Sequence, residues 1–195
     1  KVVILGAGPA GLEAARIAAE RGFKPVIFEK ASEIGGQLNL ANKPPKKDKI
    51  TWLIDYYQAM IDKYGIEVCL NTEATAERIA MENPCKVINA IGSSPVLPRS
   101  IPGLDQDYII TPPQVLSGEV RLTGKKICVV GSGMTGIETA EFLQEKGNVI
   151  ELYEMADEIG PGLFFQNLID VMRRLAPGGC QFFPKHQLLS VQEHE

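Results

Sequence analysis

The chain reads Val2-Val3-Ile4-Leu5-Gly6-Ala7-Gly8-Pro9-Ala10-Gly11 near its N-terminus and Ile127-Cys128-Val129-Val130-Gly131-Ser132-Gly133-Met134-Thr135-Gly136 further along. One constant offset in the numbering superimposes the three glycines of the first stretch on the three glycines of the second. The same offset relates residues well outside these stretches: Gly22 to Gly147, Glu29 to Glu154, and Gly35 to Gly160. The repeat therefore predicts two copies of one structural unit.

Each copy has the sequence surroundings of a strand, a tight turn and a helix. Apolar runs rich in β-branched residues precede the first glycine, which is typical of a strand buried on both faces. Helix formers with apolar stripes follow the last glycine, and a second apolar run then ends in a glutamate. These segments are 2–5, 12–21 and 25–28 in the first copy and 127–130, 137–146 and 149–153 in the second. The expected fold is α/β, with two Rossmann-like βαβ dinucleotide-binding units built on parallel sheets.

The residue types also fit the requirements of a dinucleotide site. The first glycine of each copy permits a tight turn, the second lets backbone N–H groups approach a pyrophosphate, and the third lets the helix pack close to the strand. The helix N-terminus offers N–H groups and a positive dipole end to the phosphates. Glu29 and Glu154 can accept hydrogen bonds from an adenosine ribose. The alternative is two ordinary strand–turn–helix units, in which each glutamate is a solvated charge at a strand end.

Composition excludes several other classes of protein. The chain has 195 residues and a net charge of −4, which disfavours binding to nucleic acid or to anionic membranes. No apolar run is long enough to span a bilayer, and no signal peptide precedes the first strand, so we expect a cytoplasmic protein. Four cysteines, at positions 69, 85, 128 and 180, form no C-x-x-C pair, and Cys128 is expected to be a small buried hydrophobe. No cluster has the spacing of metal ligands.

The segments outside the two fingerprints complete the predicted organisation. Residues 50–64 predict an amphipathic helix whose apolar face, including Trp52 and Tyr56, belongs to the core. A buried strand is expected over 86–91 and a further strand over 188–191. We predict a first dinucleotide-binding domain over 1–100, a connector over 101–123 that is rich in Pro and Gly, and a second dinucleotide-binding domain over 124–195. The C-terminal part of the fold is expected to be truncated.

Three further motifs carry a resemblance to a known family. They are the first fingerprint with Glu29-Lys30, the loop Gly35-Gly36-Gln37-Leu38-Asn39-Leu40-Ala41, and the strand end Ala90-Ile91-Gly92-Ser93-Ser94-Pro95. Together they resemble the FAD/NAD(P)-binding module of the 2,4-dienoyl-CoA reductase / NADH:flavin oxidoreductase family, which is a flavoprotein module of the type that binds two dinucleotides. Ile91 stands where the alanine-threonine-glycine motif of such flavoproteins has threonine. The glutamate synthase small subunit is similar too, but its loop after the glycine pair differs.

The resemblance implies that residues 1–100 are the FAD-binding domain and that residues 124–195 are an incomplete NAD(H)-binding domain. It also implies two sets of cofactor-binding residues. For FAD they are Gly6, Gly8, Pro9, Ala10, Gly11, Glu29, Lys30, Gly36, Gln37, Ala74, Ala90, Ile91 and Gly92. For NADH they are Gly131, Ser132, Gly133, Met134, Thr135, Gly136, Glu138 and Glu154. Ala74 is expected to touch the adenine through its backbone, and Thr135 and Glu138 to lie near the nicotinamide. Glu154 favours NADH over NADPH, because a carboxylate repels a 2′-phosphate.

The resemblance also implies a larger protein. In full-length relatives an N-terminal barrel carries FMN and the substrate, and an iron–sulfur cluster (4Fe-4S) connects that barrel to this module. We therefore expect hydride transfer from NADH to FAD, with electrons passing on to the cluster and FMN, and we assign no catalytic acid or base here. The chain lacks the late Gly-Asp segment that contacts the flavin in relatives, so we expect nucleotide binding with little turnover. The alternative function is a non-catalytic structural module that binds ADP or AMP.

Overall fold

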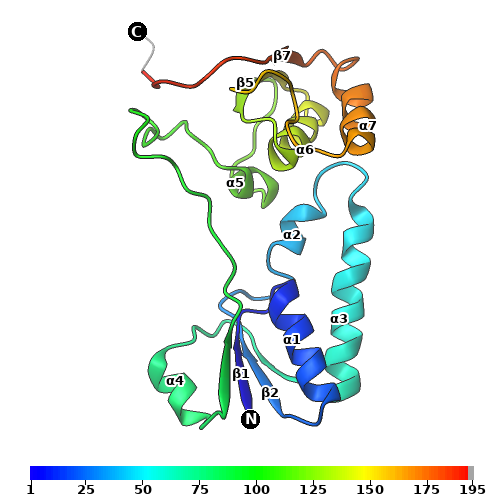
Figure 1. Ribbon diagram of the computed structural model, residues 1–195, viewed down its shortest axis with the longest axis vertical. Helices are drawn as coiled ribbons and strands as arrows, with labels where there is room; N and C mark the ends of the chain where they lie inside the picture. Colours follow the sequence, from blue (N-terminus) through cyan, green and yellow to red (C-terminus); the bar gives the residue numbers. More distant parts are fainter. Residues whose placement is uncertain (193–195) are drawn as a thin grey trace. The chain divides into compact units, whose positions relative to one another are not determined.

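The computed structural model describes residues 1–192 and contains two compact units (Figure 1). The first unit comprises residues 1–42 and 46–94, and the second comprises 43–45 and the chain from residue 95 onward. Each unit contains one of the two glycine fingerprints and one parallel β-sheet. The predicted α/β class with parallel sheets is therefore confirmed.

The first unit has a four-stranded parallel sheet in the order β3-β2-β1-β4. Its strands are β1 (Val2–Leu5), β2 (Pro25–Phe28), β3 (Glu67–Cys69) and β4 (Lys86–Asn89). Its helices are α1 (Pro9–Glu20), α2 (Leu38–Ala41), the 3-10 turn η1 (Asp48–Ile50), α3 (Thr51–Tyr64) and α4 (Ala76–Met81). The strands β1 and β2 pair in parallel and are connected through α1, so they form the predicted βαβ unit. Gly22, with φ of +81°, follows the end of α1, where the chain turns back toward the sheet.

Both faces of the first sheet are covered. On one face Val2, Ile4 and Ile27 pack with residues of α1 and α3, and on the other Val3 and Phe28 pack with Ala74 and Ile79. Figure 1 shows α1 and α3 on one side of the strands and α4 on the other. The prediction that the first strand is buried on both faces is confirmed, since Val2, Val3 and Ile4 are all buried.

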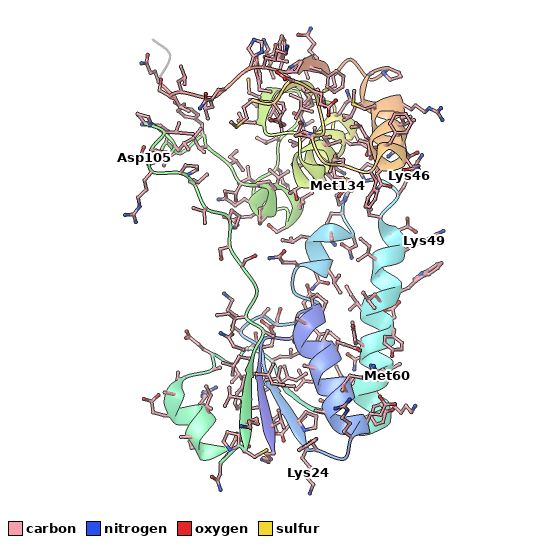
Figure 2. The ribbon with its side chains drawn as sticks, viewed as in Figure 1. Lys24, Lys46, Lys49, Met60, Asp105 and Met134 are labelled. Atoms are coloured by element: carbon pink, nitrogen blue, oxygen red, sulfur yellow. The ribbon has the colours of Figure 1, made fainter. Side chains whose placement is uncertain are left out.

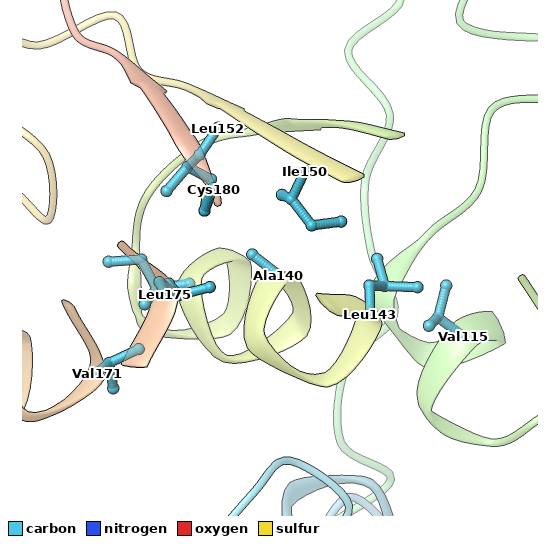
Figure 3. Close-up of a cluster of buried hydrophobic side chains, with 9 residues drawn as sticks. Val115, Ala140, Leu143, Ile150, Leu152, Val171, Leu175 and Cys180 are labelled. Carbon is cyan, nitrogen blue, oxygen red and sulfur yellow. The ribbon is translucent and has the colours of Figure 1, made fainter. Parts of the chain in front are cut away.

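The second unit has a three-stranded parallel sheet in the order β5-β6-β7. Its strands are β5 (Lys126–Val130), β6 (Val149–Tyr153) and β7 (Gln181–Phe183), and its helices are α5 (Pro112–Leu116), α6 (Met134–Glu145) and α7 (Phe165–Leu175). Figure 3 shows the core of this unit, where Ala140 and Leu143 of α6 lie beneath Ile150 and Leu152 of β6. Val115 of α5 joins the same core, so part of the predicted connector packs into this unit.

Several expected burials are wrong. Cys128 and Val130 of β5 are exposed, because within residues 1–192 this strand pairs only with β6 and the helices of this unit pack on the opposite sheet face. The strand β4 is exposed along most of its length for a related reason, since it lies at the edge of its sheet. Trp52 and Tyr56 are 65% and 43% exposed, so only part of the apolar face of α3 reaches the core.

The last expected strand is also wrong. Residues 188–191 form no strand, and the backbone N–H of Val191 instead donates to the carbonyl of Pro102 over 2.9 Å. The third strand of this sheet is β7, which pairs in parallel with β6 through Phe182 and Phe183. The strand β7 has only three residues, and an apolar pattern of that length cannot be distinguished from a loop by sequence alone.

Candidate functional site

The first glycine loop connects β1 to α1, and two of its glycines are required by the protein itself. Gly6 has φ of +96°, and a Cβ there would lie 2.5 Å from the carbonyl oxygen of Ala90. A Cβ on Gly11 would lie 1.9 Å from the carbonyl oxygen of Gly6. Backbone conformation and close packing both exclude a larger residue at Gly6, and close packing alone excludes one at Gly11.

The second glycine loop, between β5 and α6, repeats this arrangement. Gly131 has φ of +97°, and a Cβ on Gly136 would lie 2.0 Å from the Gly131 carbonyl oxygen. Met134 opens α6 directly after this loop, and its position is labelled in Figure 2. The predicted roles of the first and third glycines in each copy are thus visible in the geometry of both loops.

The middle glycines, Gly8 and Gly133, have no such internal reason to be glycine. Their φ angles of −74° and −60° are accessible to any residue, and a Cβ on either would meet no protein atom within 4 Å. Both are N-caps of helices that begin without a side-chain cap, so backbone N–H groups face outward there. Glycine at these two positions fits the close approach of a phosphate group to the backbone.

Glu29, at the end of β2, is 8% exposed and turns back to the first glycine loop. Its Oε2 accepts a hydrogen bond from the backbone N–H of Ala7 over 2.6 Å, and its Oε1 accepts one from Ala31 over 2.8 Å. A carboxylate has about four acceptor positions, so each oxygen of Glu29 has room for a further donor such as a ribose hydroxyl. Glu29 is therefore placed between the glycine loop and the chain that leaves β2.

Glu154, at the end of β6, repeats this placement with an additional contact. It is 7% exposed, its Oε1 accepts from the Ala156 N–H over 2.9 Å, and its Oε2 accepts from the Ser132 N–H over 2.8 Å. The Ser132 hydroxyl donates to the same Oε2 over 2.7 Å. Hydrogen bonds from Ala156 and Ser132 lower the pKa of Glu154 and so favour its charged form.

The hydroxyl of Ser132 makes a second hydrogen bond, which the sequence did not predict. It accepts a hydrogen bond from the backbone N–H of Gly160 over 2.8 Å, in the loop that follows β6. In the first copy the corresponding N–H, that of Gly35, donates to the carbonyl of Ala7 over 2.8 Å. The signal available in the sequence was a serine at the position where the first copy has alanine.

The loop after β2 closes on the first glycine loop. A Cβ on Gly36 would lie 3.0 Å from the Cα of Gly8, so the two backbones are in close contact. The Gln37 amide donates to the carbonyl of Ser93 over 3.0 Å, which ties this loop to the segment after β4. Gly36 and Gln37 are thus brought together with Gly8, as expected of residues that line one cofactor.

The other residues predicted to bind FAD lie at several different places in the first unit. Pro9 is the first residue of α1, Ala10 and Lys30 are exposed, and Ala90 donates from its N–H to Leu5 over 2.9 Å. Ile91 is 71% exposed and lies beyond the end of β4, followed by Gly92 with φ of +75°. Ala74 packs on the sheet face that carries Val3 and Phe28.

In the second unit the remaining candidates lie in the first turns of α6. Met134 and Glu138 are half-buried and Thr135 is exposed. All four cysteines are free thiols, and residues 1–192 hold no group of His, Cys, Asp and Glu side chains that could bind a metal ion. Over the same residues, every helix is too short or too polar to cross a bilayer.

Two parallel sheets, each with a glycine loop, an uncapped helix N-terminus and an acid at the end of the next strand, define the class of dinucleotide-binding α/β domains. A family model described as "Pyridine nucleotide-disulphide oxidoreductase" matches residues 1–176, and the chain belongs to this family. The family name refers to disulphide chemistry, for which the described part of this chain contains no bonded cysteine pair.

Individual relatives are reductases and oxidases. The chain is 38% identical over 182 residues to an NADH oxidase of Thermoanaerobacter brockii, covering 92% of this chain and 28% of that protein. It is 36% identical over 159 residues to a cinnamate reductase of Clostridium sporogenes, covering 82% of this chain and 23% of that protein. The structure of a 2-naphthoyl-CoA reductase complex matches with a TM-score of 0.92 at 34% identity, covering 98% of this chain and 29% of that chain.

These findings confirm the resemblance to the 2,4-dienoyl-CoA reductase / NADH:flavin oxidoreductase group. The chain spans less than a third of the length of these three proteins. Dinucleotide binding is the property that the matched family model supports for the residues present.

Proposed function

We propose that the first unit binds FAD and the second binds NADH, as the cofactor-binding portion of a flavin oxidoreductase. The observation that carries the proposal is glycine at positions 8 and 133, where neither φ nor packing within the protein requires it. A phosphate that approaches the backbone of each loop supplies the missing reason. When bound, FAD supplies the chemistry of accepting a hydride from NADH.

The residues of this chain bind and orient the two cofactors in this proposal. The first loop, with Gly36 and Gln37 against it, holds the FAD pyrophosphate, and Glu29 accepts the ribose hydroxyls of the adenosine. The second loop holds the NADH pyrophosphate, and Thr135 and Glu138 line the path toward the nicotinamide. The remaining candidates of each unit contribute backbone contacts.

The second site prefers NADH to NADPH in our proposal. Glu154 is held ionised by backbone and hydroxyl donors, and a negative charge next to a ribose repels a 2′-phosphate. Arginine is the residue that accommodates the 2′-phosphate in NADPH sites, and none directly follows Glu154 in this chain.

We propose further that the electrons leave toward a part of the full-length protein that this chain does not contain. The relatives of similar sequence are more than three times longer than the segment they share with this chain. By the family resemblance, that part is a barrel with FMN and a 4Fe-4S cluster, and the protein is cytoplasmic. Four free thiols fit such a reducing compartment.

A second function uses the same glycines. In a non-catalytic structural module the first site holds ADP or AMP, and Glu29 with the first loop is sufficient for that role, since the ribose and phosphates that they are proposed to bind are also present in ADP.

An absorbance spectrum of the purified protein, followed by anaerobic addition of NADH, separates the two functions. Flavin bands at about 375 and 450 nm that bleach on addition of NADH are expected for the oxidoreductase portion. Release of ADP or AMP on denaturation, without flavin bands, is the result that favours the structural module. Flavin that NADH leaves oxidised, together with no binding of NADH in a calorimetric titration, contradicts the assignment of the second site.

A further inference from the structure

One buried hydroxyl joins three parts of the second glycine loop. Ser132 is 0% exposed, and its hydroxyl donates to Glu154 Oε2 over 2.7 Å while accepting from the Gly160 N–H over 2.8 Å. The Ser132 backbone N–H donates to the same carboxylate oxygen over 2.8 Å. The glycine loop, the acid at the end of β6 and the loop after β6 therefore meet at a single side chain.

The first unit makes the corresponding connections without a hydroxyl. Ala7 occupies the position of Ser132, its N–H donates to Glu29 over 2.6 Å, and its carbonyl accepts from the Gly35 N–H over 2.8 Å. Ala7 shows that this loop folds with alanine at the position. The hydroxyl of Ser132 is therefore an addition to the second site that the βαβ fold does not require.

The two bonds to Glu154 Oε2 restrict how the carboxylate is presented. Two donors on one oxygen fill the acceptor positions of that oxygen and fix the torsions of a side chain that otherwise has several rotamers. Oε1, which accepts from Ala156, then remains as the oxygen with capacity for an outside donor. In Glu29 each oxygen has one protein donor, so neither oxygen is selected.

We propose that Ser132 is a positioning residue that sets the preference of the second site for NADH, because it fixes the carboxylate of Glu154 to accept a ribose 2′-hydroxyl and to repel a 2′-phosphate. This inference rests on the proposed binding of NADH at that site. A charge held at a fixed place in a poorly solvated site discriminates more strongly than a mobile one, since Coulomb repulsion grows as solvation falls. Hydrogen bonds to the charged form also keep Glu154 ionised, which is consistent with its lowered pKa.

The test is a double-mutant cycle on cofactor preference. The dissociation constants for NADH and NADPH are measured by calorimetry for the wild-type protein, Ser132→Ala, Glu154→Gln and the double variant, at one pH and salt concentration. Ser132→Ala is expected to reduce the preference for NADH about tenfold, the effect of losing one hydrogen bond to a charged group. In the Glu154→Gln background the same change is expected to alter the preference by less than about twofold, because the residue acts through Glu154.

Controls distinguish this role from general damage. Glu145→Gln, at the exposed C-terminal end of α6, removes one negative charge away from the loop and is expected to leave the preference unchanged. Ser132→Cys keeps the approximate volume with a weaker donor and is expected to lose preference in the same direction.

Each of the other outcomes refutes either the role of Ser132 or the proposed NADH site. Wild-type protein that binds NADH with a preference unaffected by Ser132→Ala refutes the role of Ser132 and leaves the site assignment standing. Effects of Ser132→Ala and Glu154→Gln that simply add also refute it, because Ser132 then acts independently of the acid. Wild-type protein that binds neither cofactor overturns both the proposed NADH site and this inference.

Discussion

The two glycine loops have nearly the same backbone but different neighbours. The φ angles of Gly6 and Gly131 differ by one degree, yet a Cβ on Gly6 would lie 2.5 Å from the Ala90 carbonyl oxygen whereas one on Gly131 would meet no atom within 4 Å. The reason is topological: β1 lies between β2 and β4, while β5 pairs only with β6 in the described residues. The motif thus determines its own turn, and the sheet around it determines how tightly that turn is enclosed.

The largest difference between the loops is expected on adding a methyl group to the first glycine. Gly131→Ala has the cost of the strained φ alone, about 1–2 kcal/mol, whereas Gly6→Ala adds a collision with the backbone of Ala90, directly after β4, for a total of about 2–5 kcal/mol. Amide hydrogen exchange in β1 and in β5, measured across a denaturant series, gives the loss of stability of each unit separately. Equal losses of stability in the two units would contradict the role assigned to the contact with Ala90.

A second contrast lies in charged residues at equivalent positions of α1 and α6. Arg16 pairs with Glu13 and Glu20 of its own helix, but the residue at the same offset in the second copy, Glu141, is 3% exposed and pairs with Arg174 of α7. Arg174 also contacts Asp170 over 2.7 Å.

Arg174→Met should therefore destabilise the second unit by about 2–4 kcal/mol, because it leaves a buried carboxylate without this cation. Arg16→Met is the matched change in the first unit, and its effect should be much smaller, since its partners are largely solvated. Urea denaturation of the two variants measures both effects. A loss from Arg16→Met as large as that from Arg174→Met would refute the distinction between helix-surface and interhelix pairs.

The middle glycines should affect binding without affecting stability, in both loops alike. Gly8→Ala and Gly133→Ala have accessible φ angles and open space at Cβ, so stability should be unchanged or rise by about 0.5 kcal/mol. Dinucleotide affinity should fall at least about tenfold at the altered site, because the methyl group occupies the approach to the backbone N–H groups. Thermal unfolding and binding titration on the same samples measure both quantities.

Gly22→Ala and Gly147→Ala are the controls for that experiment. Both glycines follow the C-terminal ends of the fingerprint helices with φ of +81°, so alanine should destabilise each unit by about 1 kcal/mol and leave affinity unchanged. Middle-glycine variants that retain full affinity would remove the main support for phosphate binding at these loops.

The two units also differ in how far their features could be predicted from sequence. The turns at Gly6 and Gly131 and the positions of Glu29 and Glu154 at strand ends agree with the sequence prediction, because turn geometry and strand ends depend on local residue types. The binding of cofactors by these residues stays a proposal. Burial of Cys128 was not, because it depends on which elements lie beside β5 and no local pattern records them. The bridge from Ser132 to Gly160 joins residues far apart in sequence, and only the difference from Ala7 signalled it.

The last expected difference between the units is an acid sensitivity that Ser132 confers on the second unit. Hydrogen bonds from Ala156 and Ser132 lower the folded-state pKa of Glu154 below its ordinary value of 4.5. The ionised carboxylate therefore stabilises the fold at pH values above 4.5. This stabilisation is fully present above the unfolded pKa and is lost as pH falls through the folded pKa. Ser132→Ala removes one donor, so the pKa of Glu154 should rise toward its ordinary value.

Urea denaturation across a pH series should therefore show Ser132→Ala to be about 1–2 kcal/mol less stable than the wild type near neutral pH. The gap should narrow below about pH 4.5, since protonation weakens the bond from Ser132 in the wild type as well. It should not close completely, because the hydroxyl still accepts from the Gly160 N–H when Glu154 is neutral. A gap independent of pH would mean that Gly160 alone accounts for the contribution of Ser132, whereas a gap that vanishes in acid would assign all of it to Glu154.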